Sequence, residues 1–171
     1  MEEQASTART ALKYGILTSV AIIIFTTITF VSGQSQNKWL AMVSYLIMIV
    51  GIYLAMKEYR ETNKGFMGYG EGLGLGSLVS AILGFFSSMF SMFYVRFIDT
   101  TIRTQILDKA RADMEAQGLD DSQIDNYMEI SEKFSSPGIM FAAGVFGFLL
   151  LGFIFSLIIA AILRRDKPVF E

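Results

Sequence analysis

The chain has 171 residues, about the length of one domain, and 53% of them are hydrophobic whereas 18% are charged. It contains no cysteine and no histidine, which excludes disulfides, thiolate or imidazole metal ligands and a Ser-His-Asp triad. The net charge of −2 argues against a basic surface for nucleic acid, so we expect no nucleic-acid partner, and nothing in the composition points to a cofactor.

The charged residues are gathered into short segments that alternate with long uncharged runs. No charge falls within residues 14–37, 39–56, 72–95 or 134–163. A helix that crosses a bilayer needs about 20 apolar residues, and these runs come close to that length or exceed it. The pattern therefore predicts an all-α integral membrane protein in which residues 1–171 form a single membrane domain. We expect a bundle of four transmembrane helices in the lipid bilayer, with spans at about 14–32, 39–57, 72–95 and 138–163.

The first span could be mistaken for the apolar core of a signal peptide. Its length argues against this, and the SGQSQ that follows offers no convincing cleavage site, so we expect the span to be retained. A short polar turn leads to the second span, whose helix is expected to continue through Lys57–Arg60 into water. Ser136-Pro137 is a helix start signal, with serine at the N-cap and proline at the first helical position, and it opens the fourth span.

The polar segment 97–136 lies between the third and fourth spans and carries two helix patterns. Asp99 can cap a first helix that ends at Gly118, and Asp120-x-x-Gln123 reads as a capping box for a second helix. The sequence thus predicts an extracytoplasmic helical hairpin whose apolar faces point at each other or at the membrane. Those faces are formed by Ile102, Ile106, Ala110 and Met114 in the first helix and by Ile124, Tyr127, Met128 and Phe134 in the second. The acidic residues of the hairpin match no EF-hand spacing, so we expect solvated surface rather than a metal site.

The distribution of lysine and arginine predicts the orientation in the membrane. Eight of these residues lie in the N-terminal segment, the turn between spans two and three and the C-terminal segment, whereas the opposite short turn has Lys38 alone. Basic residues in short segments favour the cytoplasmic side. We therefore expect both termini in the cytoplasm.

Glycine recurs just before and within the start of the third span, and three interpretations compete for this segment. A phosphate-binding loop is disfavoured because the Gly-Lys-Ser/Thr ending is missing. An unwound segment would expose backbone to an ion or solute, as in the broken helices of transporters. Close helix packing is favoured because the glycines are spaced four apart. The glycines concerned are Gly68, Gly70, Gly72, Gly74 and Gly76.

Small residues also continue along one face of the third span and recur in the fourth. This spacing lets two helix backbones approach closely, so we expect spans three and four to contact each other, near Gly84 or Ser88 on one side and Gly147 or Gly152 on the other. The residues assigned to helix packing are Ser77, Ala81, Gly84, Ser88, Ser91, Gly147, Gly152 and Ser156.

Glu71 is the one acid beside the start of the third span and the best single candidate for a functional side chain. A carboxylate in the membrane is costly and marks a functional site by default. At the N-terminus of a helix, however, an acid is stabilised by the helix dipole and simply caps the helix. Capping is the favoured interpretation, and proton or cation handling is the alternative.

Several short motifs follow one another along nearly the whole chain. They are Lys13-Tyr14-Gly15, Ile52-x-Leu54-Ala55-x-Lys57-x-Tyr59-Arg60, Gly68–Gly76 with Glu71, Tyr94-x-x-Phe97-Ile98-Asp99, Ser136-Pro137 and Ile158–Ile162. In this order the chain resembles a family of small four-span bacterial membrane proteins, domain of unknown function four-one-nine-nine, common in Bacteroidetes. The resemblance implies a Gram-negative inner membrane and brings no activity and no site residues.

The function expected from the sequence is that of a non-enzymatic structural, assembly or partner-binding protein of the inner (plasma) membrane. Its partner would be a second copy of the chain or another membrane protein. The alternative is a small oligomeric transporter or channel for an ion or small solute, with Glu71 near the pathway.

Overall fold

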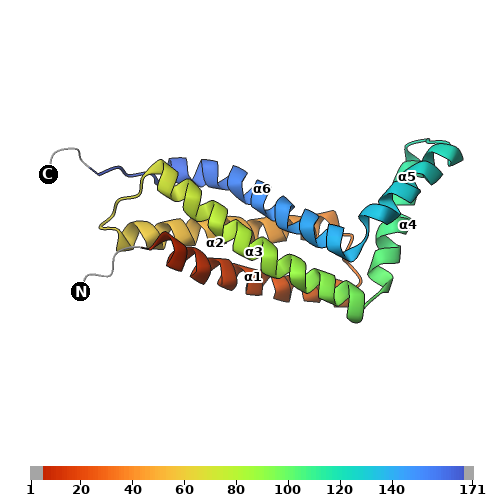
Figure 1. Ribbon diagram of the computed structural model, residues 1–171, viewed down its shortest axis with the longest axis horizontal. Coiled ribbons are helices and arrows are strands. Elements are labelled where there is room, and N and C mark those ends of the chain that lie inside the picture. The colour runs from red at the N-terminus through yellow and green to blue at the C-terminus, as the bar shows by residue number, and fades with distance from the viewer. Residues whose placement is uncertain (1–5, 168–171) are drawn as a thin grey trace. The chain divides into compact units, whose positions relative to one another are not determined.

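The computed structural model describes residues 6–167 as an all-helical chain (Figure 1). Four of the helices are long and apolar enough to cross a membrane, and two shorter ones stand between the third and the last of these. The predicted fold class is confirmed. The helices are α1 (Thr7–Val31), α2 (Lys38–Thr62), α3 (Tyr69–Phe97), α4 (Thr101–Ala116), α5 (Asp121–Phe134) and α6 (Pro137–Leu163).

The spanning helices are longer than the spans predicted for them. Two of them begin at a capping side chain, which satisfies a backbone group that the helix leaves free. The Ser6 side chain accepts a hydrogen bond from the backbone N–H of Arg9, and the Asn37 side chain accepts one from Trp39. The helix α3 likewise begins at Tyr69, so four of the five glycines before Ser77 lie within regular helix.

The chain forms two compact units, and each is described by itself. The first comprises Met1–Ser87 and Val145–Glu171, and the second comprises Ser88–Gly144. In the first unit α1, α2, the start of α3 and the end of α6 form a bundle (Figure 1).

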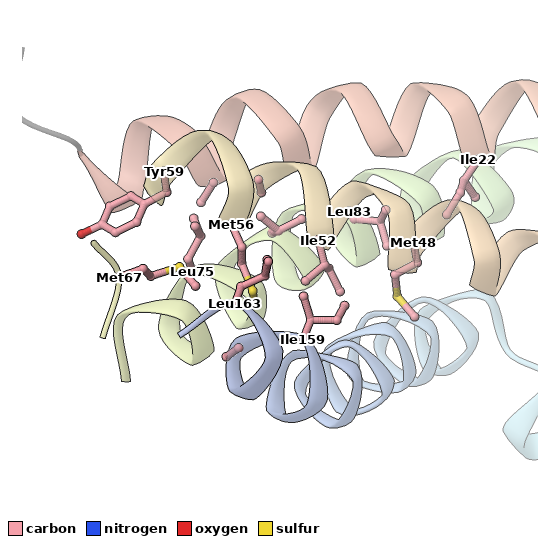
Figure 2. Close-up of a cluster of buried hydrophobic side chains, with 14 residues drawn as sticks. Ile22, Met48, Ile52, Met56, Tyr59, Met67, Leu75, Leu83, Ile159 and Leu163 are labelled. Carbon is pink, nitrogen blue, oxygen red and sulfur yellow. The ribbon is translucent and has the colours of Figure 1, made fainter. Parts of the chain in front are cut away.

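The core of the first unit is a continuous cluster of apolar side chains drawn from all four helices (Figure 2). The helix α2 contributes Met48, Ile52 and Met56, which are fully buried. Facing side chains come from α3 and α6, and Met67 closes the cluster from the loop before α3. The remaining members are Ala11, Ile22, Ala55, Tyr59, Leu75, Val79, Leu83, Ile159, Ala160 and Leu163.

The outer surface of this bundle is also apolar. Ile24, Leu46 and Ile162 are more than half exposed, and they represent a much larger set of exposed hydrophobic side chains along the spanning helices. Such a surface is unfavourable in water and is what lipid contact requires. The chain is therefore a membrane protein.

The second unit contains the predicted hairpin, formed by α4 and α5. Gly118 has φ of +77° at the corner, and Asp120 with Gln123 forms the capping box, so both predictions are confirmed. Asp99 was predicted to cap α4, and its carboxylate accepts hydrogen bonds from the Thr101 N–H (3.0 Å) and hydroxyl (2.6 Å). The helix begins at Thr101, so the N-cap position is Thr100, one residue later than predicted.

The apolar faces of the hairpin are only partly buried. Ile102 of α4 and Ile124 of α5 are buried, and the helices are linked by an ion pair between Arg111 and Asp125 at 3.2 Å. Tyr127 and Phe134, predicted on the same side as Ile124, are exposed. The hairpin therefore leaves apolar surface on α5 that its own residues do not cover.

Candidate functional site

The first candidate site is the start of α3, where Glu71 and the glycines lie. The Glu71 side chain is exposed, and its Oε2 accepts a hydrogen bond from the backbone N–H of Gly68 at 2.8 Å. The carbonyl of Gly68 in turn accepts the first helical bond, from the N–H of Gly72. Glu71 therefore satisfies a backbone donor that the helix start leaves free, as in one half of a capping box.

The four glycines of this segment that lie within α3 divide into two sets with different surroundings. A Cβ on Gly72 would lie 3.0 Å from Ala160 Cβ of α6, and a Cβ on Gly76 would overlap the Ser156 side chain and lie 2.8 Å from Met56 Cε. Among the described residues, nothing lies within 4 Å of a Cβ placed on Gly70 or on Gly74. Two of the glycines thus permit a close approach of α6, and two face open surroundings.

Further along the first unit, α3 and α6 meet at Gly84 and Gly152. A Cβ on Gly84 would lie 2.8 Å from Phe148 Cβ, and a Cβ on Gly152 would overlap Ser80. Gly147, also assigned to packing, has no such neighbour in the described part of the chain. In the second unit the corresponding close approach is between Gly144 and Ser88.

The small residues that face the interior match those assigned to packing only in part. Ser88 and Ser156 were assigned and are buried, and Ser80 and Ser87 are buried although neither was assigned. Ser77, Ala81 and Ser91 are only half-buried. The side-chain hydroxyls mostly bond within their own helix. Ser80 donates to the carbonyl of Gly76 at 2.8 Å, and Ser156 donates to that of Gly152 at 2.6 Å. Such bonds satisfy a hydroxyl in lipid without any second helix.

Ser87 Oγ is an exception among the residues that the structure describes. It is a buried side-chain oxygen without a hydrogen-bond partner there.

The second candidate site is a polar cluster that joins α1 to α2, and it was not predicted. The Lys13 ammonium lies 2.5 Å from Glu58 Oε2, and the Tyr14 hydroxyl donates to the same oxygen at 2.8 Å. Lys13 also lies 5.2 Å from the centre of the Tyr14 ring. The only available signal was that Lys13-Tyr14 and the charged end of α2 each stand at the end of a span. Nothing in the sequence indicates which partner each residue takes.

The third candidate site is a polar cluster that joins the loop between α2 and α3 to the segment after α6. Met67 and Arg165 form an isolated antiparallel bridge, in which each backbone N–H donates to the other residue's carbonyl at 2.9 Å. Arg60 of α2 donates to the carbonyl of Leu163 at 3.3 Å, which satisfies one of the last acceptors of α6. The Arg165 guanidinium lies 6.0 Å from the centre of the Phe66 ring.

The loop reaches this bridge through two residues with positive φ. Lys64 has φ of 57° and Gly65 has φ of 86°, and the side-chain amide of Asn63 donates to the carbonyl of Phe66 at 3.0 Å. Only glycine adopts this conformation cheaply, so Gly65 is required by the turn itself. The side chain of Met67 is fully buried and anchors the loop in the core.

These clusters provide no set of metal ligands among the residues that the structure describes. Within residues 6–167, no group of three acidic side chains lies close enough to hold a metal, and the sequence has no histidine or cysteine. The Glu58 carboxylate is held by Lys13 and Tyr14, and Glu71 is held by the start of α3. The polar side chains therefore join helices and loops to one another.

A family model described as "Protein of unknown function (DUF4199)" matches residues 13–165. The chain belongs to the DUF4199 family. The resemblance drawn from the sequence motifs is thereby confirmed. No curated protein and no solved structure matches the chain.

The limits of the DUF4199 match coincide with the two unpredicted clusters. The match begins at Lys13, which pairs with Glu58, and ends at Arg165, which forms the bridge with Met67.

Proposed function

We propose that this DUF4199 protein is a non-enzymatic membrane protein that acts through its surface, as a structural, assembly or partner-binding component. The observation that carries the proposal is the filled interior of the first unit. Met48, Ile52, Met56 and Leu83 are fully buried there, and the buried hydroxyls of Ser80 and Ser156 bond to carbonyls of their own helices. An interior occupied in this way favours a scaffold over a solute pathway.

Close packing between α3 and α6 is part of the same proposal. The positions that support it are Gly72, Gly76, Gly84 and Gly152, where a Cβ would meet α6 or α3 within about 3 Å. Without a hydrophobic driving force in lipid, helices associate through such close van der Waals contact.

The protein is proposed to lie in the inner (plasma) membrane with both termini in the cytoplasm. The start of α1, the loop between α2 and α3 and the end of α6 lie at one end of the first unit (Figure 1). These segments and their neighbours carry basic residues: Lys13 in α1, Arg60 in the last turn of α2, and Arg164 and Arg165 just after α6. Basic residues near span ends favour the cytoplasmic side.

Reporter fusions test this orientation. A reporter that is active only outside the cytoplasm should give a signal when inserted at Asp121, in the hairpin, and none when fused after Glu171, which lies outside the described residues. The reverse pattern would overturn the assignment.

Crosslinking in native membranes followed by affinity purification tests the function. We expect a defined membrane protein, or a second copy of the chain, to be recovered in constant ratio to the tagged chain. Proteoliposomes that contain the chain should show no more ion or solute flux than empty vesicles.

The alternative is an oligomeric transporter with Glu71 near its pathway. It would be favoured by ion or solute flux that falls in the Glu71→Gln variant but not in the Glu61→Gln variant. Glu61→Gln is the control because Glu61, on α2, is another exposed carboxylate. Such flux, together with recovery of no partner beyond the chain itself, would overturn the proposal.

A further inference from the structure

The helix α5 carries an exposed stripe of apolar side chains, formed by Tyr127, Ile130 and Phe134. Their exposed fractions are 53%, 51% and 64%. Residues three and four apart lie on one face of a helix, so the three side chains form a continuous surface along α5.

The apolar stripe is distinct from the side of α5 that packs against α4. That side carries the buried Ile124 and also Asp125, which pairs with Arg111. At about 100° per residue, Tyr127, Phe134 and Ile130 lie roughly 60°, 80° and 120° round the helix from Ile124, and on the opposite side of it from Asp125. The stripe therefore adjoins the contact with α4, and because its three side chains are more than half exposed it is available to something other than the hairpin.

The acidic residues of α5 lie on the opposite side of the helix from the stripe. At about 100° per residue, the mean direction of the acidic side chains is roughly 175° round the helix axis from the mean direction of the stripe. They are Asp121, Asp125, Glu129 and Glu132. A helix with an uncharged aromatic and aliphatic face opposite a charged face is amphipathic, as helices at a membrane interface are, but the charged face of α5 is acidic where theirs is usually basic.

Chain connectivity places one end of the stripe at the membrane. Phe134 is the last residue of α5, and α6 begins at Pro137, so no more than about 10 Å of chain separates Phe134 from the start of a spanning helix. The helix α6 has 27 residues and therefore extends about 40 Å, and no charge occurs from Phe134 to Leu163. A bilayer with its head groups is about 40–45 Å thick, so the start of α6, and Phe134 three residues before it, fall at head-group depth.

We propose that the apolar stripe of α5 contacts the head-group region of the bilayer, on the side of the membrane where α3 ends and α6 begins. Tyrosine and phenylalanine are favoured at this depth. Because the charged face of α5 carries four acidic residues and one lysine, the surface that the stripe fits is one of zwitterionic rather than anionic lipid. This inference is independent of the proposed function.

Tryptophan fluorescence in lipid tests the proposal with the full-length chain. The chain has one tryptophan, Trp39, so Trp39→Phe provides a silent background. Ile130→Trp then reports on the stripe, and Glu129→Trp is the matched control at the neighbouring residue on the charged face. Tyr127→Trp is a second reporter on the stripe in case Ile130→Trp impairs folding.

Each variant is reconstituted into phosphatidylcholine vesicles with and without brominated acyl chains. We expect the Ile130→Trp and Tyr127→Trp emission to be blue-shifted and strongly reduced by the brominated lipid, whereas the Glu129→Trp emission stays at the wavelength of indole in water and is little reduced. Equal quenching at all three positions would overturn the proposal. Blue-shifted emission without quenching would also overturn it, because a protein surface would then cover the stripe. Quenching that requires anionic lipid would contradict the choice of zwitterionic lipid.

Discussion

Replacing Gly84 by alanine adds a single methyl group where α3 meets α6. That carbon would lie 2.8 Å from Phe148 Cβ and 3.1 Å from the carbonyl oxygen of Val145. Carbon atoms in contact are ordinarily about 3.5–4.0 Å apart, so the methyl group overlaps α6 by about 1 Å. Neither a Cβ nor a backbone oxygen can rotate away, so the helices themselves must separate.

Overfilling a closely packed site costs about 1–3 kcal/mol. The greater helix propensity of alanine returns at most about 1 kcal/mol. With that full return, we expect Gly84→Ala to lower the free energy of unfolding by up to about 2 kcal/mol, and Gly84→Leu to lower it further.

Gly74→Ala is the matched control, because it is the same substitution in the same helix. In the described structure no atom lies within 4 Å of a Cβ at Gly74, so this variant keeps the gain in helix propensity without the overlap. Denaturant titration of the purified protein in detergent measures both free energies of unfolding. If the two variants are equally stable, the close approach of α6 at Gly84 does not exist and the reasoning fails.

Three further predictions concern the polar clusters. Arg165→Pro removes one backbone donor of the bridge and should cost about 0.5–1.5 kcal/mol, with faster amide exchange in the loop before α3, whereas Arg165→Ala keeps both hydrogen bonds and should have little effect. Glu58→Gln removes the ion pair with Lys13, whose side chain is half exposed, so the loss of unfolding free energy should be only about 0.2–1 kcal/mol and should vanish in high salt. Hydrogen bonds from the backbone of Gln123 and from a neighbouring hydroxyl hold the pKa of Asp120 below its usual 3.8. The carboxylate therefore stabilises the start of α5 above that pH and loses the effect as the pH falls through the lower folded value, so amide protection there should fall in acid and stay level in Asp120→Asn.

The fold class was readable from the sequence because the charges themselves mark the ends of the spans. The hairpin was readable because its signals are local: Gly118 needs positive φ, and Asp120 reaches a backbone N–H only three residues away. Such features depend on a few neighbouring residues and on no distant contact.

The inner face of α3 was harder to assign. Small residues occur on nearly every side of this helix, and in lipid the outer face is as apolar as the inner one, so no polar contrast identifies the interior. The spacing therefore did not distinguish Gly72 and Gly76 from Gly70 and Gly74, and it missed the burial of Ser80.

The polar clusters at the end of the first unit were missed for a different reason. Lys13 and Glu58 are 45 residues apart, and a single sequence does not show which charges pair at that distance. The bridge between Met67 and Arg165 joins backbone atoms, which every residue except proline offers alike, so no side-chain pattern could have revealed it.

That bridge makes the local chain length more important than the local residue types. Met67 lies two residues before the start of α3, and Arg165 lies two residues after the end of α6. Many side chains can occupy position 165, whereas position 67 needs an apolar side chain because Met67 is buried in the core. At either position an inserted or deleted residue would bring the wrong N–H and carbonyl to the partner segment. Homologous chains should therefore show no gaps at either side of the bridge, with free substitution at position 165 and apolar residues alone at position 67.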